Sequence, residues 1–169
     1  MAFPARIAIA SRNAHKLREI GRICADWPVE WLTVENHDGP WPEVDETGGT
    51  YLENALLKAG EEATDERNLE ELIRALKGVP GSGRTARYRC VAALAFPEVR
   101  EVHAEGICEG TLVPKPRGLR GFGYDPIFVP AGWDRTMAEL ADEEKDRISH
   151  RGRALRALRE ALAIGLTAG

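Results

Sequence analysis

The sequence has few cysteines, few aromatic residues and no long apolar run. Its three cysteines, Cys24, Cys90 and Cys108, are widely spaced and form no CxxC pair. This spacing argues against a zinc site and against a disulfide framework, and it favours the reducing environment of the cytoplasm. No apolar stretch is long enough to span a bilayer, and the first residues lack the apolar core of a signal peptide.

An excess of positive charge is also missing, since the formal net charge is −4 at pH 7. A protein with this balance and no basic stripe is not expected to bind nucleic acid or an anionic membrane over a broad surface. A small anionic ligand remains compatible with the charge, because its site needs only local positive groups. With 43% apolar residues among 169, the chain has enough material for one compact domain over residues 1–169.

Helical and strand-like periodicities alternate along the chain. Short apolar or alternating runs predict strands at residues 6–10, 29–34, 85–96, 99–107 and 127–129. Capping residues and apolar spacing predict helices after Asn13 and Thr64, and at residues 136–147 and 150–163. The two longest strands are expected to be antiparallel neighbours. This intermingling favours the α/β class, with a mixed central sheet flanked by helices.

The first candidate site segment is Ser11-Arg12-Asn13-Ala14-His15-Lys16, which follows a predicted strand and opens a predicted helix. Such a turn points backbone N–H groups and the positive end of the helix dipole at one place, which suits an anion. Lys16 lies one turn into the helix and can reach a phosphate as a point charge. The alternative is an ordinary capped helix with a solvated lysine.

The second segment runs from Asp45 to Asn54 and leads into a helix that carries Lys58. The carboxylate oxygens of Asp45 and Glu46 are hard ligands that suit Mg²⁺, which usually takes one or two carboxylates together with substrate phosphates. A solvated acidic loop is the alternative.

The third segment reads Gly121-Phe122-Gly123-Tyr124-Asp125 and continues to Phe128. An aromatic ring between two glycines is costly to leave in water. Phe122 could stack on a nucleobase, while the glycines let backbone groups approach the edge of the base. The alternative is a turn whose aromatic side chains fill the core.

The fourth segment lies between the two predicted C-terminal helices. Lys145, Ser149, His150 and Arg151 concentrate positive charge and hydrogen-bond donors there. The alternative is a polar helical hairpin with charges on its surface.

In this order, the four segments resemble the signature of the inosine/xanthosine triphosphate pyrophosphatase family. The matching pieces are Ser11-x-Asn13-x-x-Lys16, Glu46-Thr-Gly-x-Thr-Tyr-x-Glu-Asn-Ala55, Gly121 to Phe128 and Ile148-Ser-His-Arg-Gly152. Connecting pieces also match, so the likeness spans nearly the whole chain. The resemblance implies an α/β fold of two lobes with the nucleotide cleft between them. It also implies Mg²⁺-dependent hydrolysis of ITP, dITP or XTP to the monophosphate and pyrophosphate.

The resemblance also assigns roles to the residues of the four segments. Residues 11–16 would wrap the triphosphate, with Lys16 neutralising its charge and Lys58 among the substrate-binding residues. Glu46 would help to hold the metal, and Asp45 is the less favoured candidate. Residues 122–125 and 149–151 would form the base pocket, with Lys145 on the same side. A homodimer is expected, with neither nucleic acid nor membrane as a partner.

Selectivity is expected to depend on position 6 of the purine. Hypoxanthine and xanthine carry an oxo acceptor there, whereas adenine carries an amino donor. Arg151 and backbone N–H groups can donate but cannot accept. Adenine would therefore place donors against donors, at a cost on the order of 1–3 kcal/mol per buried unpaired group.

One element of the family is missing from this sequence. After the second motif the family carries an Ala-Asp-Asp-Ser-Gly-Leu-like segment, whose second aspartate is the general base and a metal ligand. Here Lys58-Ala-Gly-Glu-Glu-Ala-Thr64 leads directly to a stretch that follows that segment in the family. The missing unit corresponds to on the order of 30 residues.

Two explanations compete for this missing unit. Either the chain has lost its catalytic base, or the sequence omits a stretch near residues 58–61. Deleting a unit from a close-packed sheet would destroy the fold, so we expect the second explanation. No catalytic residue is therefore assigned.

Two rival functions lie close to the implied one. A non-catalytic nucleotide-binding module would keep the pocket without a base, and would bind ITP or XTP without releasing pyrophosphate. A Maf-type pyrophosphatase would have other base preferences. The segments 121–128 and 149–151 match the inosine triphosphatase pattern rather than that one.

Overall fold

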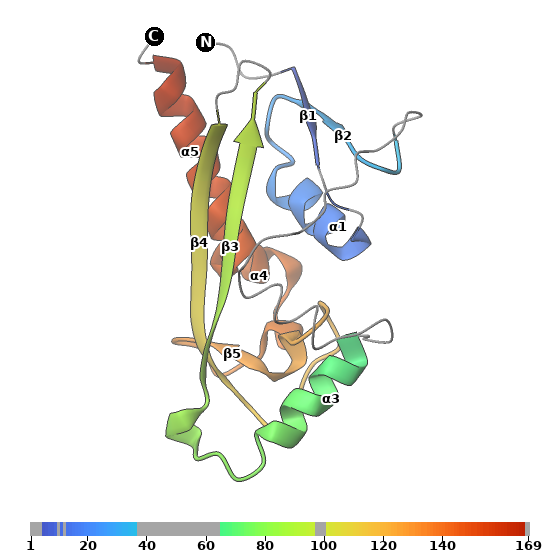
Figure 1. The fold of residues 1–169 in the computed structure, drawn as a ribbon, viewed down its shortest axis with the longest axis vertical. Coiled ribbons are helices and arrows are strands. Elements are labelled where there is room, and N and C mark those ends of the chain that lie inside the picture. Colours follow the sequence, from blue (N-terminus) through green and yellow to red (C-terminus); the bar gives the residue numbers. More distant parts are fainter. Residues whose placement is uncertain (1–4, 10, 12, 37–64, 97–100, 168–169) are drawn as a thin grey trace.

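A computed structural model describes residues 5–9, 11, 13–36, 65–96 and 101–167 of the chain. These residues form helices together with parallel and antiparallel strand pairs, so the predicted α/β class is confirmed. Figure 1 shows two long strands along the length of the molecule, with the C-terminal helix and the N-terminal elements beside their upper part. The parallel strands and the antiparallel strands form separate sheets within the described part of the chain.

The N-terminal elements form a strand–helix–strand unit. Strands β1 (Arg6–Ala8) and β2 (Glu30–Leu32) pair in parallel, and helix α1 (Ala14–Ile23) connects them. Asn13 begins the helix as predicted, because its side-chain oxygen accepts a hydrogen bond from the backbone N–H of Lys16 at 3.0 Å.

The two longest strands form an antiparallel ribbon. Strand β3 (Thr85–Ala95) pairs with β4 (Glu101–Leu112) along its whole length, which confirms the predicted pairing. Strand β4 extends five residues beyond the predicted end, to Leu112, because its last residues also pair with β5 (Phe128–Pro130). A short 3₁₀ turn, η1 (Gly81–Gly83), precedes β3.

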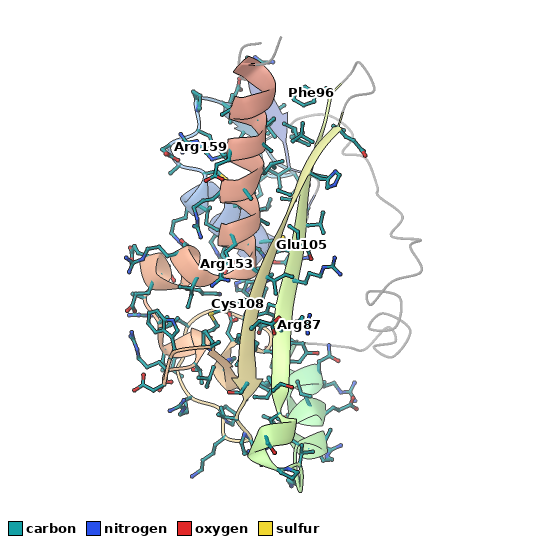
Figure 2. All side chains as sticks on the ribbon, turned by 90° about the vertical axis from the view of Figure 1, so that its left-hand side faces the viewer. Arg87, Phe96, Glu105, Cys108, Arg153 and Arg159 are labelled. Atoms are coloured by element: carbon teal, nitrogen blue, oxygen red, sulfur yellow. The ribbon has the colours of Figure 1, made fainter. Side chains whose placement is uncertain are left out.

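Helix α5 (His150–Thr167) packs along one face of this ribbon (Figure 2). The close approach depends on Gly106 in β4, since a Cβ atom there would overlap with the carbonyl oxygen of His150 and the backbone nitrogen of Ala154. Arg153 of α5 also donates to the carbonyl of Ile107 at 2.9 Å. The resulting core joins α5 to α1 and β1, and its buried members are Ile7, Cys24, Trp27, Leu155, Leu158 and Leu162.

The segment before α5 differs from the single helix predicted at residues 136–147. That prediction is wrong, because the segment is a 3₁₀ turn, η3 (Met137–Glu139), followed by helix α4 (Asp142–Ile148). Each of these two elements has its own acidic side chain that caps its start. Glu139 accepts the N–H of Thr136 at 2.7 Å, and Glu144 accepts the N–H of Ala141 at 2.9 Å.

Two further elements complete the described part of the chain. Helix α3 (Asp65–Ala75) ends near Gly78, whose φ of 83° is typical of a glycine that follows a helix. A 3₁₀ turn, η2 (Asp125–Ile127), leads into β5. None of the described helices combines the length and the hydropathy that crossing a membrane requires.

Gly106→Ala is expected to destabilise the protein by about 1–3 kcal/mol, because its Cβ atom would push α5 away from β4. Urea unfolding of the parent and the variant measures this change. Gly21→Ala is the matched control. Nothing lies within 4 Å of a Cβ atom at Gly21, which is inside α1, so alanine should stabilise the helix by roughly 0.5–1 kcal/mol. An unchanged unfolding midpoint in Gly106→Ala would contradict the proposed close packing.

Candidate functional site

The first predicted segment lies where β1 turns into α1. The side-chain oxygen of Ser11 accepts the N–H of Asn13 at 3.3 Å, and Asn13 in turn caps the helix. Ala14, His15 and Lys16 are exposed on the first turn of α1. The predicted strand–turn–helix arrangement is confirmed, and it places Lys16 on the first turn of α1, at the positive end of the helix dipole.

The second predicted segment, with Asp45, Glu46 and Lys58, lies outside the described residues, as does Arg12 of the first. Within the described residues no group of three His, Cys, Asp or Glu side chains could hold a metal ion.

The third predicted segment is a tight turn held by its own aspartate. Gly121 and Gly123 adopt φ angles of 75° and 59°, which disfavour residues with a side chain. Asp125 is buried, and its Oδ2 accepts the backbone N–H of Phe122 at 2.9 Å. This bond fixes the backbone on which Phe122 and the exposed Tyr124 stand.

Buried charges connect this turn to α1 and to the two C-terminal helices. The ammonium group of Lys145 lies 2.7 Å from Oδ2 of Asp125 and 2.6 Å from Oε1 of Glu19. The other carboxylate oxygen of Glu19 accepts from Nη1 of Arg151. Lys145 is only 4% exposed and Glu19 only 6%. Two cations and two anions therefore form one compact cluster.

The two sides of this cluster influence each other's protonation. Burial by itself would raise the pKa of Glu19, but Arg151 and Lys145 together bring it below its ordinary value. Burial would lower the pKa of Lys145, but Asp125 and Glu19 raise it above its ordinary value. The charged forms of both groups are therefore the stable ones near neutral pH.

The ring of Phe122 is the point where three of the predicted segments meet. The imidazole of His15 stacks on it, with ring centroids 4.8 Å apart and an angle of 25° between the planes. The guanidinium carbon of Arg151 lies 4.9 Å from the ring centroid, and the ammonium nitrogen of Lys145 lies 5.3 Å from it. The Phe122 ring is therefore contacted by a stacked imidazole and by two cations that lie over it.

Ser149 and His150 are more enclosed than their neighbours in this segment. Ser149 is buried between α4 and α5, and its hydroxyl accepts the N–H of Gly152 at 3.1 Å. His150 stacks on Tyr88 at 4.8 Å, and its Nδ1 has no hydrogen-bond partner among the described residues. Burial, aided by Arg151, lowers the pKa of His150 to about 3, so the imidazole is neutral near pH 7. It can therefore donate or accept a hydrogen bond, but it does not act as a cation.

Sequence reasoning missed two residues of this site, Glu19 and Tyr88. Tyr88 of β3 stacks on Phe128 at 4.3 Å, and its hydroxyl lies 3.5 Å from Oδ1 of Asp125. Burial raises the pKa of Tyr88, so this hydroxyl stays protonated. One signal for Glu19 was present, since it lies three positions after Lys16 on the same predicted helix.

The chain is similar to known proteins over nearly its whole length. The model of the Ham1 family matches it in two ranges, residues 7–64 and 59–161. A dITP/XTP pyrophosphatase of Geobacillus kaustophilus is 38% identical over 189 aligned positions, which cover 91% of this chain and 92% of that protein. A dITP/XTP pyrophosphatase of Geobacter sulfurreducens is 37% identical over 192 positions, which cover 93% and 96% of the two chains.

Solved structures give the same result. The Staphylococcus aureus Ham1 protein superposes with a TM-score of 0.74 at 30% identity, covering 94% of this chain and 98% of that one. A Ham1 protein from Coxiella burnetii superposes with a TM-score of 0.75 at 30% identity, covering 95% and 99%. This chain belongs to the Ham1 family.

Acid is expected to destabilise the fold through His150. Its folded pKa of about 3 lies below the ordinary value of 6.5, so the unfolded chain binds the proton more readily. The contribution of neutral His150 to the free energy of unfolding is complete above pH 6.5 and is lost as the pH falls from there towards 3. The loss between pH 8 and pH 5 should amount to about 2 kcal/mol.

His150→Gln removes the titrating group, so its free energy of unfolding should fall by about 2 kcal/mol less than that of the parent over this pH range. Urea unfolding at pH 8 and pH 5 measures both proteins. Equal losses in the two proteins would show that His150 is not held neutral by the fold.

Proposed function

We propose that this chain hydrolyses deaminated purine nucleoside triphosphates, ITP, dITP and XTP, to the monophosphate and pyrophosphate. One observation carries the proposal: three segments far apart in the sequence meet at the ring of Phe122, with His15, Arg151 and Lys145 around it. Membership of the Ham1 family and the relatives named dITP/XTP pyrophosphatase support it.

The ends of the site suit the two ends of a nucleotide. The first turn of α1 carries the exposed Lys16 and the positive end of the helix dipole, which favour phosphate. The same turn carries His15, which contacts Phe122, so the phosphate end and the aromatic face are adjacent. A purine stacked on Phe122 would therefore place its triphosphate towards α1.

The hydrogen-bond donors close to Phe122 would recognise the base. The guanidinium group of Arg151 has five N–H donors and no acceptor. Its Nη1 is directed to Glu19, and the group lies close to the ring on which the base would stack. A 6-oxo group can accept from such a donor, whereas the amino group of adenine cannot.

The Mg²⁺ ion would be held by Glu46, or by Asp45 in the less favoured case, together with the substrate phosphates. The described carboxylates nearest to the aromatic face do not compete for it, since Glu19 and Asp125 are both paired with buried cations. Hard carboxylate oxygens suit Mg²⁺, which when bound neutralises phosphate charge.

We also propose that a unit carrying the general base is missing from the sequence between residues 58 and 61. The Ham1 family model supports this, because it matches the chain in two separate ranges, which overlap at residues 59–64, and not in one continuous range. The alignment with the Geobacillus relative supports it too, since its 189 positions exceed the 169 residues of this chain. For the assembly, we propose a homodimer that acts in the cytoplasm.

Pyrophosphate release from ITP, dITP, XTP and ATP, measured in the presence and absence of Mg²⁺, tests the function. Two proteins are compared: the 169-residue chain, and a variant with the additional positions of the Geobacillus relative inserted after Lys58. In a protein that is active, we expect pyrophosphate release from ITP, dITP and XTP with Mg²⁺, and much slower release from ATP. Release by the longer protein alone would place the base in the inserted unit. Binding of ITP without release by either protein would favour the non-catalytic module.

In the active protein, Glu46→Gln should raise the Mg²⁺ concentration that gives half-maximal activity, because one ligand charge is lost. An unchanged Mg²⁺ titration would make Asp45 the candidate ligand.

Phe122→Ala and Arg151→Ala should affect selectivity differently. Stacking is tolerant of base identity and is worth at most about 1–3 kcal/mol per base, so Phe122→Ala should weaken ITP and ATP by similar factors. Arg151→Ala should weaken ITP much more than ATP, because it removes a donor to the 6-oxo group. Values of kcat/KM for both nucleotides measure the effect. If the ITP/ATP ratio stays the same in Arg151→Ala, selectivity must come from backbone groups.

A further inference from the structure

We propose that His15 occupies the base site of the free protein, because its imidazole covers the face of Phe122 on which a purine would stack, and that an incoming nucleotide displaces it. The inference rests on the proposed function, which assigns Phe122 to the base. It adds an autoinhibitory contact, made by a side chain of the same turn that is expected to hold the phosphates.

The ring of Phe122 has three neighbours in the described part of the chain. The imidazole of His15 lies parallel to it within 25°, with the ring centroids 4.8 Å apart. The cationic groups of Arg151 and Lys145 lie 4.9 and 5.3 Å from its centroid. A ring stacked at this distance covers the surface that another aromatic group would need, so a base can reach this face only if His15 leaves.

The two cations are not free to leave. Lys145 is only 4% exposed and is paired with Glu19 and Asp125, and the side chain of Arg151 is paired with Glu19 as well. Removing either cation from the cluster would leave a buried carboxylate without its partner, which is costly. These two neighbours of Phe122 therefore stay in place when a ligand arrives.

His15 is held much more loosely. It is exposed on the first turn of α1, and its ring nitrogens have a hydrogen bond only from Arg18 among the described residues. The guanidinium group can only donate, so Nδ1 of His15 accepts from Nη2 of Arg18, at 2.9 Å. Arg18 is exposed too, and water can replace an exposed hydrogen bond at little cost. Of the three neighbours, His15 is therefore the one that can be displaced.

The place of His15 in the helix lets base and phosphate be tested separately. His15 lies between the capping residue Asn13 and Lys16, so its backbone belongs to the helix start that suits an anion, while its side chain covers Phe122. Inorganic pyrophosphate has no base and can bind at the helix start without moving the imidazole. A nucleotide has to move it.

Calorimetry measures the dissociation constants of IMP and inorganic pyrophosphate for the parent and for His15→Gln. The glutamine keeps a polar side chain but has no ring to cover Phe122. We expect His15→Gln to bind IMP about two- to tenfold more tightly, which corresponds to the loss of one aromatic pair that competes with the base. Pyrophosphate should not bind more tightly. An equal gain for both ligands would overturn the proposal, because the substitution would then act on the phosphates.

Two further variants separate the ring from other effects of the substitution. His15→Phe keeps a ring over Phe122 and should bind IMP no more tightly than the parent, so a gain equal to that of His15→Gln would overturn the proposal. His103→Gln is the matched control. It makes the same substitution at an exposed histidine of β4, opposite Ala93, and should leave IMP affinity unchanged.

NMR spectra follow the imidazole directly. In the free parent, the ring of Phe122 should shift the C–H resonances of His15 upfield, and IMP should abolish this shift while pyrophosphate does not. IMP binding with the shift intact would mean that the base uses another surface, and would overturn the proposal. A parent that binds IMP, with no gain in His15→Gln, would overturn the role of His15 and leave the proposed function intact. A parent that does not bind IMP would overturn both.

Discussion

The ammonium group of a lysine that is only 4% exposed can remain charged only if anions surround it, and Lys145 meets this requirement through two elements at once. Asp125 reaches it from the turn that carries Phe122, and Glu19 reaches it from α1. Neither carboxylate could turn elsewhere without leaving an uncompensated charge in the interior. The relative placement of α1, the Phe122 turn and the C-terminal helices therefore depends on this one cation.

The ribbon of β3 and β4 supplies the rigid side of the same arrangement. Helix α5 can lie against β4 because Gly106 has no side chain, and His150 and Arg151 occupy the first turn of that helix. Tyr88 then fills the space between His150 and Phe128. The positions of His150 and Arg151 are thus set by backbone packing on one side and by charge pairing on the other.

Local chemistry made much of this fold predictable from the sequence. Asn13 caps α1 because its own side chain bonds to Lys16 three residues on, and the β3–β4 pairing follows from two alternating runs with a short connection. The break between η3 and α4 was not predicted, because helical periodicity continues across it while Glu139 and Glu144 cap two separate turns. A pattern of apolar residues does not show where one helical turn ends and a separately capped helix begins.

The candidate residues could be named from the sequence, but the contacts among them could not. The segments of Lys16, Phe122 and Arg151 could be named from their types and order. The role of Glu19 could not, because its partners Lys145 and Arg151 lie 126 and 132 positions away in the sequence. Pairings over such distances are a property of the folded chain.

If Phe122 binds the base as proposed, its stack with His15 makes base binding an exchange of one ring for another. One face of the Phe122 ring already carries an aromatic neighbour from the protein itself. A base that arrives on that face replaces one ring by another, so its gain is only the difference between two similar contacts. In the proposed function every purine would face the same substitution, so stacking on this face would not distinguish one purine from another. Under this proposal, hydrogen bonds at the edge of the base, rather than stacking, would distinguish a deaminated purine from adenine.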